Sequence, residues 1–556
     1  MVKVTEENLP LQRIYHWEKA RADQVYLTQP MGGDSVHDYT WAQAVGEARR
    51  MAAYLKSHGF EPGARVAIFS KNCAHWIMAD FAIWMAGYVS VPLYPTLAAQ
   101  TIRQILEHSE TKALFVGRLD DWEQMKSGIP DSVQRIGFPG SADAGSRAWD
   151  DIVATTESLK ESPTRPAEDL ATIIYTSGTT GMPKGVMHGF HSFAATGEVI
   201  REMLGTDENA RMLSYLPRSH VAERVGVEAN SIRSGFRVYF SESLATFLKD
   251  LQRARPTLFF SVPRLWVKFQ QGVFAKTPKE ALDPLLKGPN GAALKKQILS
   301  QLGLDTIQYA VTGAAPLPAA VLSWYRELGL ELLEAYAMTE NFGVGHLNRP
   351  GRARVGYVGE PQPGVECRLS ASGEVLVKTP WNMQGYYKEP EKTKEVLGAD
   401  GWLQTGDLGE IDEQGRLKIT GRAKELFKTS KGKYVAPAPI ENKLAAHSKI
   451  EACCVTGANY GQPFALVLLA PDVAANAKDA AVKDELTKSL AAHLQQVNDT
   501  LDPHEQLDFL CLVKDPWTVD NGFLTPTLKI KRNAVEKTYT PLFDGWLARR
   551  EAVVWE

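Results

Sequence analysis

The segment Tyr175–Gly185 holds residue types in an order that can grip a polyphosphate. It reads Tyr-Thr-Ser-Gly-Thr-Thr-Gly-Met-Pro-Lys-Gly, and the apolar run Leu170–Ile174 before it predicts a buried strand. Glycines let backbone N–H groups approach an anion closely, and the hydroxyls and the lysine add donors and positive charge. The order differs from the common phosphate loop, in which four residues separate the glycines and Lys-Ser/Thr follows. Because a strand precedes it, we interpret the segment as a phosphate-binding loop rather than a surface turn.

A second segment, Glu334–Glu340, combines an aromatic ring, a hydroxyl and a carboxylate. Tyr336 can offer its ring face to adenine, and Thr339 can donate a hydrogen bond to a phosphate. Glu340 can supply the hard oxygen ligand that Mg²⁺ prefers. Taken alone, the same residues fit a helix N-cap with an acidic first turn equally well.

Two shorter elements carry weaker signals. The small residues of Thr312–Leu317 permit a flat ligand to lie against the backbone, although alone this is an ordinary turn. In Gly401–Gly409, Asp407 follows a glycine, and an aspartate in such a turn is common in isolation.

Together these segments resemble the adenylate-forming superfamily, which comprises acyl-CoA synthetases, peptide-synthetase adenylation domains and beetle luciferases. The resemblance extends over nearly all 556 residues. Leu216–Glu223 is similar to the Leu-Pro-x-x-His-x-x-Glu element of long-chain and bubblegum-type synthetases, and Val262–Trp266 supports the same branch. The chain departs from the family at Ala337 and Leu528, where Gly is usual, at Arg218, where an apolar residue is usual, and at Arg224, where some relatives have a tryptophan gate.

The resemblance implies which residues bind ATP and its products. Asp407 corresponds to the carboxylate that accepts hydrogen bonds from the ribose hydroxyls, and a carboxylate suits a diol because it has two acceptor oxygens. Glu340, with Thr176 as a second ligand, corresponds to the Mg²⁺ site. The expected ATP- or AMP-binding residues are Thr176, Ser177, Gly178, Thr179, Thr180, Gly313, Ala314, Ala315, Glu334, Tyr336, Thr339, Asp407, Arg422 and Lys428.

Three residues are expected to act in catalysis. They are Lys184 in the phosphate loop, Lys529 in a segment similar to the family's C-terminal adenylation element, and His220, which matches a histidine beside the acyl site. Lys424 falls at the family's hinge position. Gly432 is expected to line the path of coenzyme A, in a segment that departs from the family's Ser-Gly-Gly loop.

These residues need alternating helices and strands to position them. Helical periodicity at Trp41–Leu55 and Ala99–Glu107 alternates with apolar strands at Arg65–Phe69 and Ala113–Val116, which favours parallel α/β sheets. With the resemblance, we expect an α/β fold with a large N-terminal domain of layered α/β subdomains and a small mobile C-terminal α+β domain. The expected limits are residues 1–421, a hinge at 422–424, and 425–556.

Composition excludes several functional classes. Hydrophobic residues make up 44% and charged residues 23%, which suits a globular protein with large cores. The net charge of −3 implies no polyanion-binding surface, so we expect no nucleic-acid partner. The five cysteines lack metal-ligand spacing and are expected to be buried free thiols in a reducing compartment. The acidic N-terminus lacks a signal peptide's apolar core, which favours the cytoplasm.

The longest apolar stretch, Trp76–Leu93, contains Asp80 and Gly87 and ends in prolines. A membrane span needs about 20 apolar residues, so we expect a buried helix near Ala74–Ala86 followed by a strand at Val89–Leu93. Peripheral contact at the inner face of a membrane and the oligomeric state stay open.

The expected activity is a fatty acyl-CoA synthetase for medium- to long-chain acids. ATP converts the carboxylate to an acyl-adenylate with release of pyrophosphate, and coenzyme A then displaces AMP. Two alternatives remain: adenylation with transfer to a carrier protein or another acceptor, and a catalytically silent nucleotide-binding module.

Overall fold

An eight-stranded sheet carries the ends of the expected phosphate loop. The computed structural model describes residues 3–176, 182–519, 521–525 and 529–556. Strand β8 (Leu170–Thr176) pairs in parallel with β4 (Val89–Leu93) and antiparallel with β9 (Lys184–Gly189), with Thr176 opposite Lys184. The sheet is completed by β3 (Arg65–Phe69), β5 (Ala113–Val116), β6 (Gln134–Gly137), β7 (Arg147–Ala148) and β19 (Gly385–Tyr386).

Helices inside the large domain form its main apolar core. Every residue of α3 (Ala74–Met85) is buried. Apolar side chains point outward around this helix, and the main apolar core packs against them. A capping box at Thr40 begins α2 (Trp41–Lys56). The core also contains α1 (Pro10–Ala20), α7 (Phe190–Leu204) and a second sheet of β10 (Arg211–Ser214), β11 (Arg237–Phe240), β1 (Val25–Pro30) and β2 (Val36–Thr40).

A third sheet brings two of the segments that are expected to bind the nucleotide to one edge. Strands β12 (Leu258–Ser261), β13 (Tyr309–Gly313) and β14 (Leu332–Tyr336) run parallel, so Gly313 lies opposite Ala335 at their carboxyl ends. The short β15 (His346–Leu347) and β16 (Glu360–Pro361) complete it. Around it lie α10 (Phe247–Ala254), α11 (Pro263–Lys276), α12 (Lys279–Lys287), α13 (Gly291–Gln301) and α14 (Ala319–Glu327).

An antiparallel sheet connects the large domain to the small one. Its strands are β17 (Glu366–Leu369), β18 (Glu374–Lys378), β20 (Leu403–Ile411) and β21 (Leu417–Arg422). Strands β20 and β21 place Asp407 opposite Arg422. A 3₁₀ turn at Ala423–Glu425 then leads into the C-terminal part.

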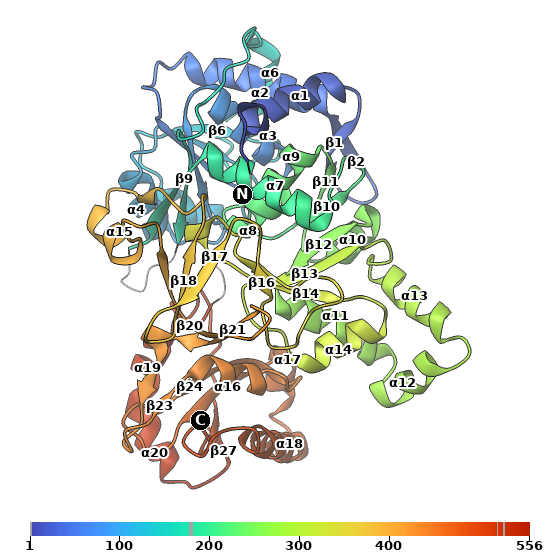
Figure 1. The fold of residues 1–556 in the computed structure, drawn as a ribbon, viewed down its shortest axis with the longest axis vertical. Helices are drawn as coiled ribbons and strands as arrows, with labels where there is room; N and C mark the ends of the chain where they lie inside the picture. The colour runs from blue at the N-terminus through green and yellow to red at the C-terminus, as the bar shows by residue number, and fades with distance from the viewer. Residues whose placement is uncertain (1–2, 177–181, 520, 526–528) are drawn as a thin grey trace.

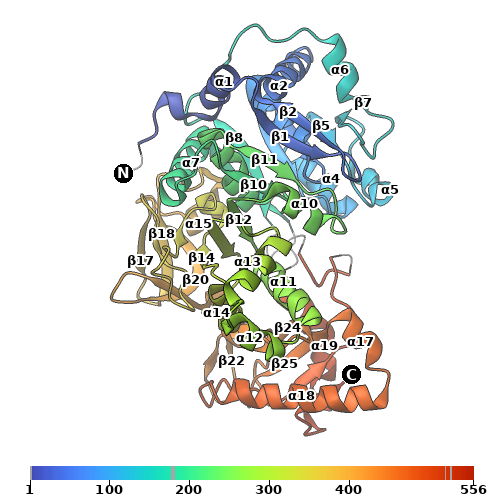
Figure 2. The same cartoon turned by 90° about the vertical axis from the view of Figure 1, so that its right-hand side faces the viewer.

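The smaller C-terminal part lies below the large domain in both views (Figures 1 and 2). Its sheet mixes an antiparallel pair, β24 (Ile450–Thr456) and β25 (Phe464–Leu469), with the parallel β26 (Leu510–Leu512) and β27 (Val553–Trp555). It buries two apolar clusters of its own against α16 (Pro437–Leu444), α18 (Ala480–Asn498), α19 (Arg532–Tyr539) and α20 (Phe543–Leu547). The expected fold class, a large α/β domain with a small α+β domain, is confirmed, while the limits at 421 and 425 stay a prediction.

Local expectations mostly match. The strands at Arg65–Phe69, Val89–Leu93 and Ala113–Val116 are found as expected. In the segment that precedes the expected phosphate loop, residues 138–168, Trp149 is fully buried and its indole N–H donates to Glu47 at 2.8 Å. Four cysteines are buried, whereas Cys367 is half-buried. No helix within the described residues is long and apolar enough to cross a membrane.

Candidate active site

Lys184 and Glu340 are joined through a tyrosine. The ammonium of Lys184 lies 4.7 Å from the centre of the Tyr386 ring, and the Tyr386 hydroxyl donates to Glu340 Oε1 at 2.8 Å. Thr176 faces Lys184 across the strand pair β8–β9. The loop residues Ser177, Gly178, Thr179 and Thr180 lie outside the described residues. A cation, a carboxylate and a phenol therefore meet at the end of the expected phosphate loop.

Tyr386 was not expected from the sequence. It lies on β19, which pairs antiparallel with β9 and sets Tyr386 opposite Val186. Burial, and then the charge of Glu340, raises the pKa of the Tyr386 phenol. The hydroxyl therefore stays a hydrogen-bond donor at all physiological pH values. The only sequence signal is an aromatic pair after a glycine, which indicates no partner at Glu340.

Thr339 and Glu340 belong to a short 3₁₀ turn, Thr339–Asn341, directly after β14. The Thr339 carbonyl accepts a hydrogen bond from Nε2 of the buried His188 at 2.7 Å. Burial lowers the pKa of His188 to about 4, so its ring is neutral near pH 7 and donates from Nε2. His188 is a second positioning residue that the sequence did not indicate.

Glu340 fits a metal that arrives with its substrate better than a metal held by protein alone. The described residues contain no group of three or more metal-ligating side chains. Mg²⁺ commonly takes one or two protein carboxylates together with substrate phosphates. Glu340 supplies one carboxylate, and Tyr386 fixes one of its oxygens. The donor set thus matches Mg²⁺ bound to a nucleotide.

Asp407 is the centre of a second group. Its carboxylate is 5% exposed; Oδ2 accepts from the Tyr336 hydroxyl at 2.7 Å, and Oδ1 accepts from Arg422 Nε at 2.9 Å. Burial, and then the charge of Asp407, raises the pKa of Tyr336, which keeps its hydroxyl protonated. Each carboxylate oxygen retains a further lone pair, so this pairing leaves Asp407 able to accept from a diol.

Gly313, Ala314, Ala315 and Glu334 lie at the neighbouring strand ends. Ala314 has a positive φ of 68°, an uncommon conformation for a residue with a side chain, and it is exposed with Ala315. Glu334 is buried, and that burial raises its pKa to about 7. Ala314 and Ala315 therefore form the exposed edge of this strand end, while Gly313 and Glu334 are buried behind it.

Lys529 reaches this region from the small domain. Its backbone N–H donates to Thr525 Oγ1 at 3.0 Å, and its carbonyl accepts from the Thr525 N–H at 2.8 Å. The side chain is exposed to solvent, yet the surrounding protein removes enough water to lower the pKa of its ammonium. The charge of Arg422 lowers that pKa further, while Asp407 and Glu340 oppose the shift. Lys529 therefore shares an electrostatic environment with both groups of the large domain.

His220 shares that environment. Burial lowers the pKa of His220 to about 4, and the charge of Lys529 adds to the effect. His220 caps a short helix by accepting from the Ala222 N–H through Nδ1 at 3.1 Å. The neutral ring therefore carries its proton on Nε2.

The remaining expected residues lie on the small domain's first elements. Lys424 is exposed in the 3₁₀ turn Ala423–Glu425. Lys428 lies on the hairpin of β22 (Phe427–Lys428) and β23 (Tyr434–Val435), with its ammonium 5.7 Å from the Tyr434 ring centre. Gly432 turns that hairpin with a φ of +77°. The structure groups these three at the start of the small domain rather than with Asp407 or Glu340.

The two arginines that depart from the family lie in a buried ionic cluster. Both Arg218 and Arg224 are fully buried, and Glu228 lies 2.9 Å from Arg218 and 2.7 Å from Arg224. Arg224 also pairs with Asp80, and both guanidinium groups lie over the Trp76 ring. Burial raises the pKa of Glu228 to about 8. The structure thus explains Arg218 as the partner of a buried carboxyl group, Glu228. No sequence motif indicated Glu228.

Known protein families match both the large and the small part of this chain. Residues 15–387 match the family model described as AMP-binding enzyme, and residues 425–551 match the AMP-binding enzyme C-terminal domain. The long-chain-fatty-acid–CoA ligase FadD15 of Mycobacterium bovis is 31% identical, with 94% of each chain covered. The human long-chain-fatty-acid–CoA ligase 1 is 29% identical over 94% of this chain and 85% of its own length.

Solved structures share the fold. The A-PCP didomain of the carboxylic acid reductase from Segniliparus rugosus, in complex with AMP, has a TM-score of 0.80 at 23% identity and covers 98% of this chain and 83% of its own. The anthranilate CoA ligase AuaEII, in complex with anthranoyl-AMP, has a TM-score of 0.78 at 20% identity and covers 97% of this chain and 100% of its own.

Proposed function

This chain belongs to the AMP-binding enzyme family, and we propose how its residues activate a fatty acid and join it to coenzyme A. The activity is that of a long-chain fatty acid–CoA ligase. A carboxylate oxygen attacks the α-phosphorus of ATP, the bond to pyrophosphate breaks, and an acyl-adenylate forms. The thiolate sulfur of coenzyme A then attacks the acyl carbon, and AMP leaves.

The first step brings an anion to an anion, so cations must offset the repulsion. Lys184 and Lys529 supply two positive charges from different domains. When bound with the nucleotide, Mg²⁺ would supply further charge neutralisation on the phosphates, held by Glu340 and Thr176. Tyr386 orients Glu340, and no protein nucleophile is required. The observation that most supports this proposal is that Lys529 of the small domain lies close enough to Asp407, Glu340 and His220 of the large domain to interact with them electrostatically.

The nucleoside is held by the second group. The ribose hydroxyls donate to Asp407, which Arg422 orients by pairing with its Oδ1. The adenine ring lies against Tyr336 and the small residues Gly313–Ala315, while the residues of 176–180 hold the phosphates. His220, neutral near pH 7, lies beside the acyl group and can donate from Nε2.

The second step requires a different set of residues. The small domain turns about Lys424, which withdraws Lys529 and brings Lys428 and Gly432 toward the path of the thiol. A lysine on the moving domain is then needed only for adenylation. The relatives that align with 94% of this chain are named long-chain-fatty-acid–CoA ligases. This similarity favours coenzyme A over a carrier protein as the acyl acceptor. We place the protein in the cytoplasm, in peripheral contact with a membrane.

A panel of carboxylic acids tests this function. Purified protein is incubated with ATP, Mg²⁺ and each acid, and pyrophosphate release is measured. Long-chain fatty acids should give the fastest release, and coenzyme A should sustain turnover. Absence of pyrophosphate release across the panel would favour a silent nucleotide-binding module instead.

A further inference from the structure

In the part of the chain that the structure describes, a single ion pair joins the large domain to the small one. Arg264, in the first turn of α11, pairs with Glu451 on β24. The Arg264 side chain is 50% exposed and that of Glu451 is 23% exposed. Figure 2 shows α11 at the lower end of the large domain, above β24. The pair therefore lies at a part of the domain interface that water reaches.

The two domains share no apolar cluster across residues 3–176, 182–519, 521–525 and 529–556. Each buried apolar cluster lies on one side of the expected hinge at 422–424. The clusters of the large domain end at Ile419, and those of the small domain begin at Phe427. Domains that meet without a shared apolar core are expected to move relative to each other. An ion pair between them can therefore bias the orientation of the small domain.

Arg264 has a fixed place relative to the edge that is expected to bind the nucleotide. Helix α11 begins directly after β12, which pairs in parallel with β13, and β13 ends at Gly313. The Tyr325 hydroxyl donates to the carbonyl of the buried Trp266 at 2.7 Å and so holds the start of α11. A residue of the small domain that pairs with Arg264 is thereby placed relative to the same edge.

On the small domain, hydrogen bonds connect the strand of Glu451 to the segment of Lys529. The carbonyl of Val455 on β24 accepts from Arg532 Nη1 at 2.6 Å, and the Val455 N–H donates to Glu441 Oε1 at 2.7 Å. The same Glu441 oxygen accepts from Arg532 Nη2 at 2.6 Å. Arg532 begins α19, three residues after Lys529. A contact that holds β24 in place therefore also holds the segment that carries Lys529.

We propose that Arg264 and Glu451 form an interdomain latch that positions Lys529 for adenylation and opens before coenzyme A attacks. This rests on the proposed function, in which the small domain turns about Lys424 between the two steps. In the orientation that forms the latch, Lys529 is close enough to Asp407 to interact with it electrostatically. The latch joins parts that the turn separates, so it favours the first orientation alone. Because water reaches the latch, its contribution is small enough for it to open in every turnover.

The two half-reactions of the full chain are measured separately. Arg264→Gln should slow single-turnover pyrophosphate release, without coenzyme A, by about two- to five-fold, the factor that an exposed ion pair contributes. Conversion of supplied acyl-adenylate and coenzyme A to thioester should proceed at the parent's rate or faster, because the latch no longer opposes the turn. Equal losses in both half-reactions would indicate a structural role alone and would overturn the proposal.

Charge exchange tests whether the two residues act as a pair. Arg264→Glu places two carboxylates against each other, so it should slow pyrophosphate release more than Arg264→Gln does. The double variant Arg264→Glu/Glu451→Arg restores opposite charges and should return the rate to within about two-fold of the parent's. Arg264→Lys keeps the charge and should resemble the parent. A double variant no faster than Arg264→Glu would contradict the latch.

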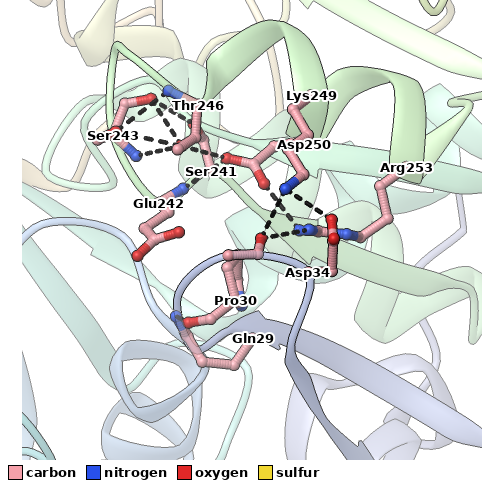
Figure 3. Close-up of polar contacts among 11 residues, drawn as sticks. Gln29, Pro30, Asp34, Ser241, Glu242, Ser243, Thr246, Lys249, Asp250 and Arg253 are labelled. Carbon is pink, nitrogen blue, oxygen red and sulfur yellow. Dashed lines mark hydrogen bonds and ion pairs between the residues drawn. The ribbon is translucent and has the colours of Figure 1, made fainter.

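A matched control removes an ion pair that lies inside the large domain. Lys249 on α10 lies 2.6 Å from Asp34 and donates to the Gly33 carbonyl at 2.9 Å (Figure 3). Its side chain is 47% exposed, close to the value for Arg264. Lys249→Gln/Asp34→Asn should leave both half-reactions near the parent's rates, and all variants should keep Tm within about 2 °C of the parent's. If the control slows pyrophosphate release alone, as Arg264→Gln should, the effect follows from any lost ion pair and the proposal is overturned.

The parent's own activity separates the latch from the proposed function. A parent that releases no pyrophosphate with any fatty acid would contradict the proposed function. A parent that releases it, together with an Arg264→Gln variant that matches it in both half-reactions, would contradict the latch alone.

Discussion

Tyr386→Phe tests the contact through which Tyr386 links Lys184 to Glu340. The change removes one hydroxyl and keeps the ring, so Lys184 retains its aromatic neighbour at 4.7 Å. Glu340 loses the donor that lies 2.8 Å from its Oε1. The carboxylate should then rotate more freely and hold Mg²⁺–ATP less well.

The magnitude follows from the kind of hydrogen bond. A hydrogen bond to a charged group contributes about 1.5–3 kcal/mol. Because Glu340 is half-buried, we expect the lower end of that range, a roughly ten-fold loss in kcat/KM for adenylation. Pyrophosphate release is measured across a Mg²⁺ titration, and the midpoint should move to higher Mg²⁺.

Two further variants separate the effect of the Tyr386 hydroxyl from that of its ring. Tyr387→Phe is the matched control, because the Tyr387 ring lies against His108 and Arg65 instead. Tyr386→Leu also removes the ring beside Lys184 and should lose about 0.5–1 kcal/mol more. If Tyr386→Phe keeps the parent's rate and Mg²⁺ midpoint, the reasoning that Tyr386 positions Glu340 is refuted.

Three other changes probe the remaining parts of the account. Lys529→Ala should slow pyrophosphate release by about 10²-fold or more, as when a preorganised cation is lost, while conversion of supplied acyl-adenylate to thioester survives; equal loss of both steps would contradict its role. Lys424→Pro removes a backbone N–H and fixes φ, so acyl-adenylate should accumulate in quenched single turnovers; a variant that completes both steps at the parent's rate would place the hinge elsewhere. Glu228 has a pKa raised by burial from 4.5 to about 8, so its contribution to stability is complete below pH 4.5 and is lost as pH rises toward 8. Glu228→Gln should therefore flatten the fall in Tm between those pH values in thermal melts, and an unchanged slope would argue against a proton on Glu228.

Local signals predicted the scaffold and many site residues. Apolar runs such as Arg65–Phe69 and Val89–Leu93 are strands because a buried parallel sheet requires continuous hydrophobicity. Asp407 and Arg422 come from separate motifs, and the antiparallel register of β20 and β21 then places them opposite each other. Their roles in the reaction stay predictions.

Contacts across long sequence separations could not be predicted in this way. Tyr386 and Glu340 are 46 residues apart and meet because β19 joins the edge of the eight-stranded sheet. Asp80 interrupts an apolar stretch, and only the fold shows that Arg224, 144 residues later, pairs with it. The net charge of −3 likewise hides a local charge of +5 in residues 263–301. A pattern within one segment carries no information on which distant segment will pack against it.

Product analysis tests the central claim most directly. The protein is incubated with a long-chain fatty acid, ATP, Mg²⁺ and coenzyme A, and the products are identified by mass and counted. The account predicts acyl-CoA, AMP and pyrophosphate in equal amounts, with acyl-adenylate appearing when coenzyme A is left out. Formation of ADP and phosphate, or of acyl-adenylate that coenzyme A never converts to a thioester, would contradict it.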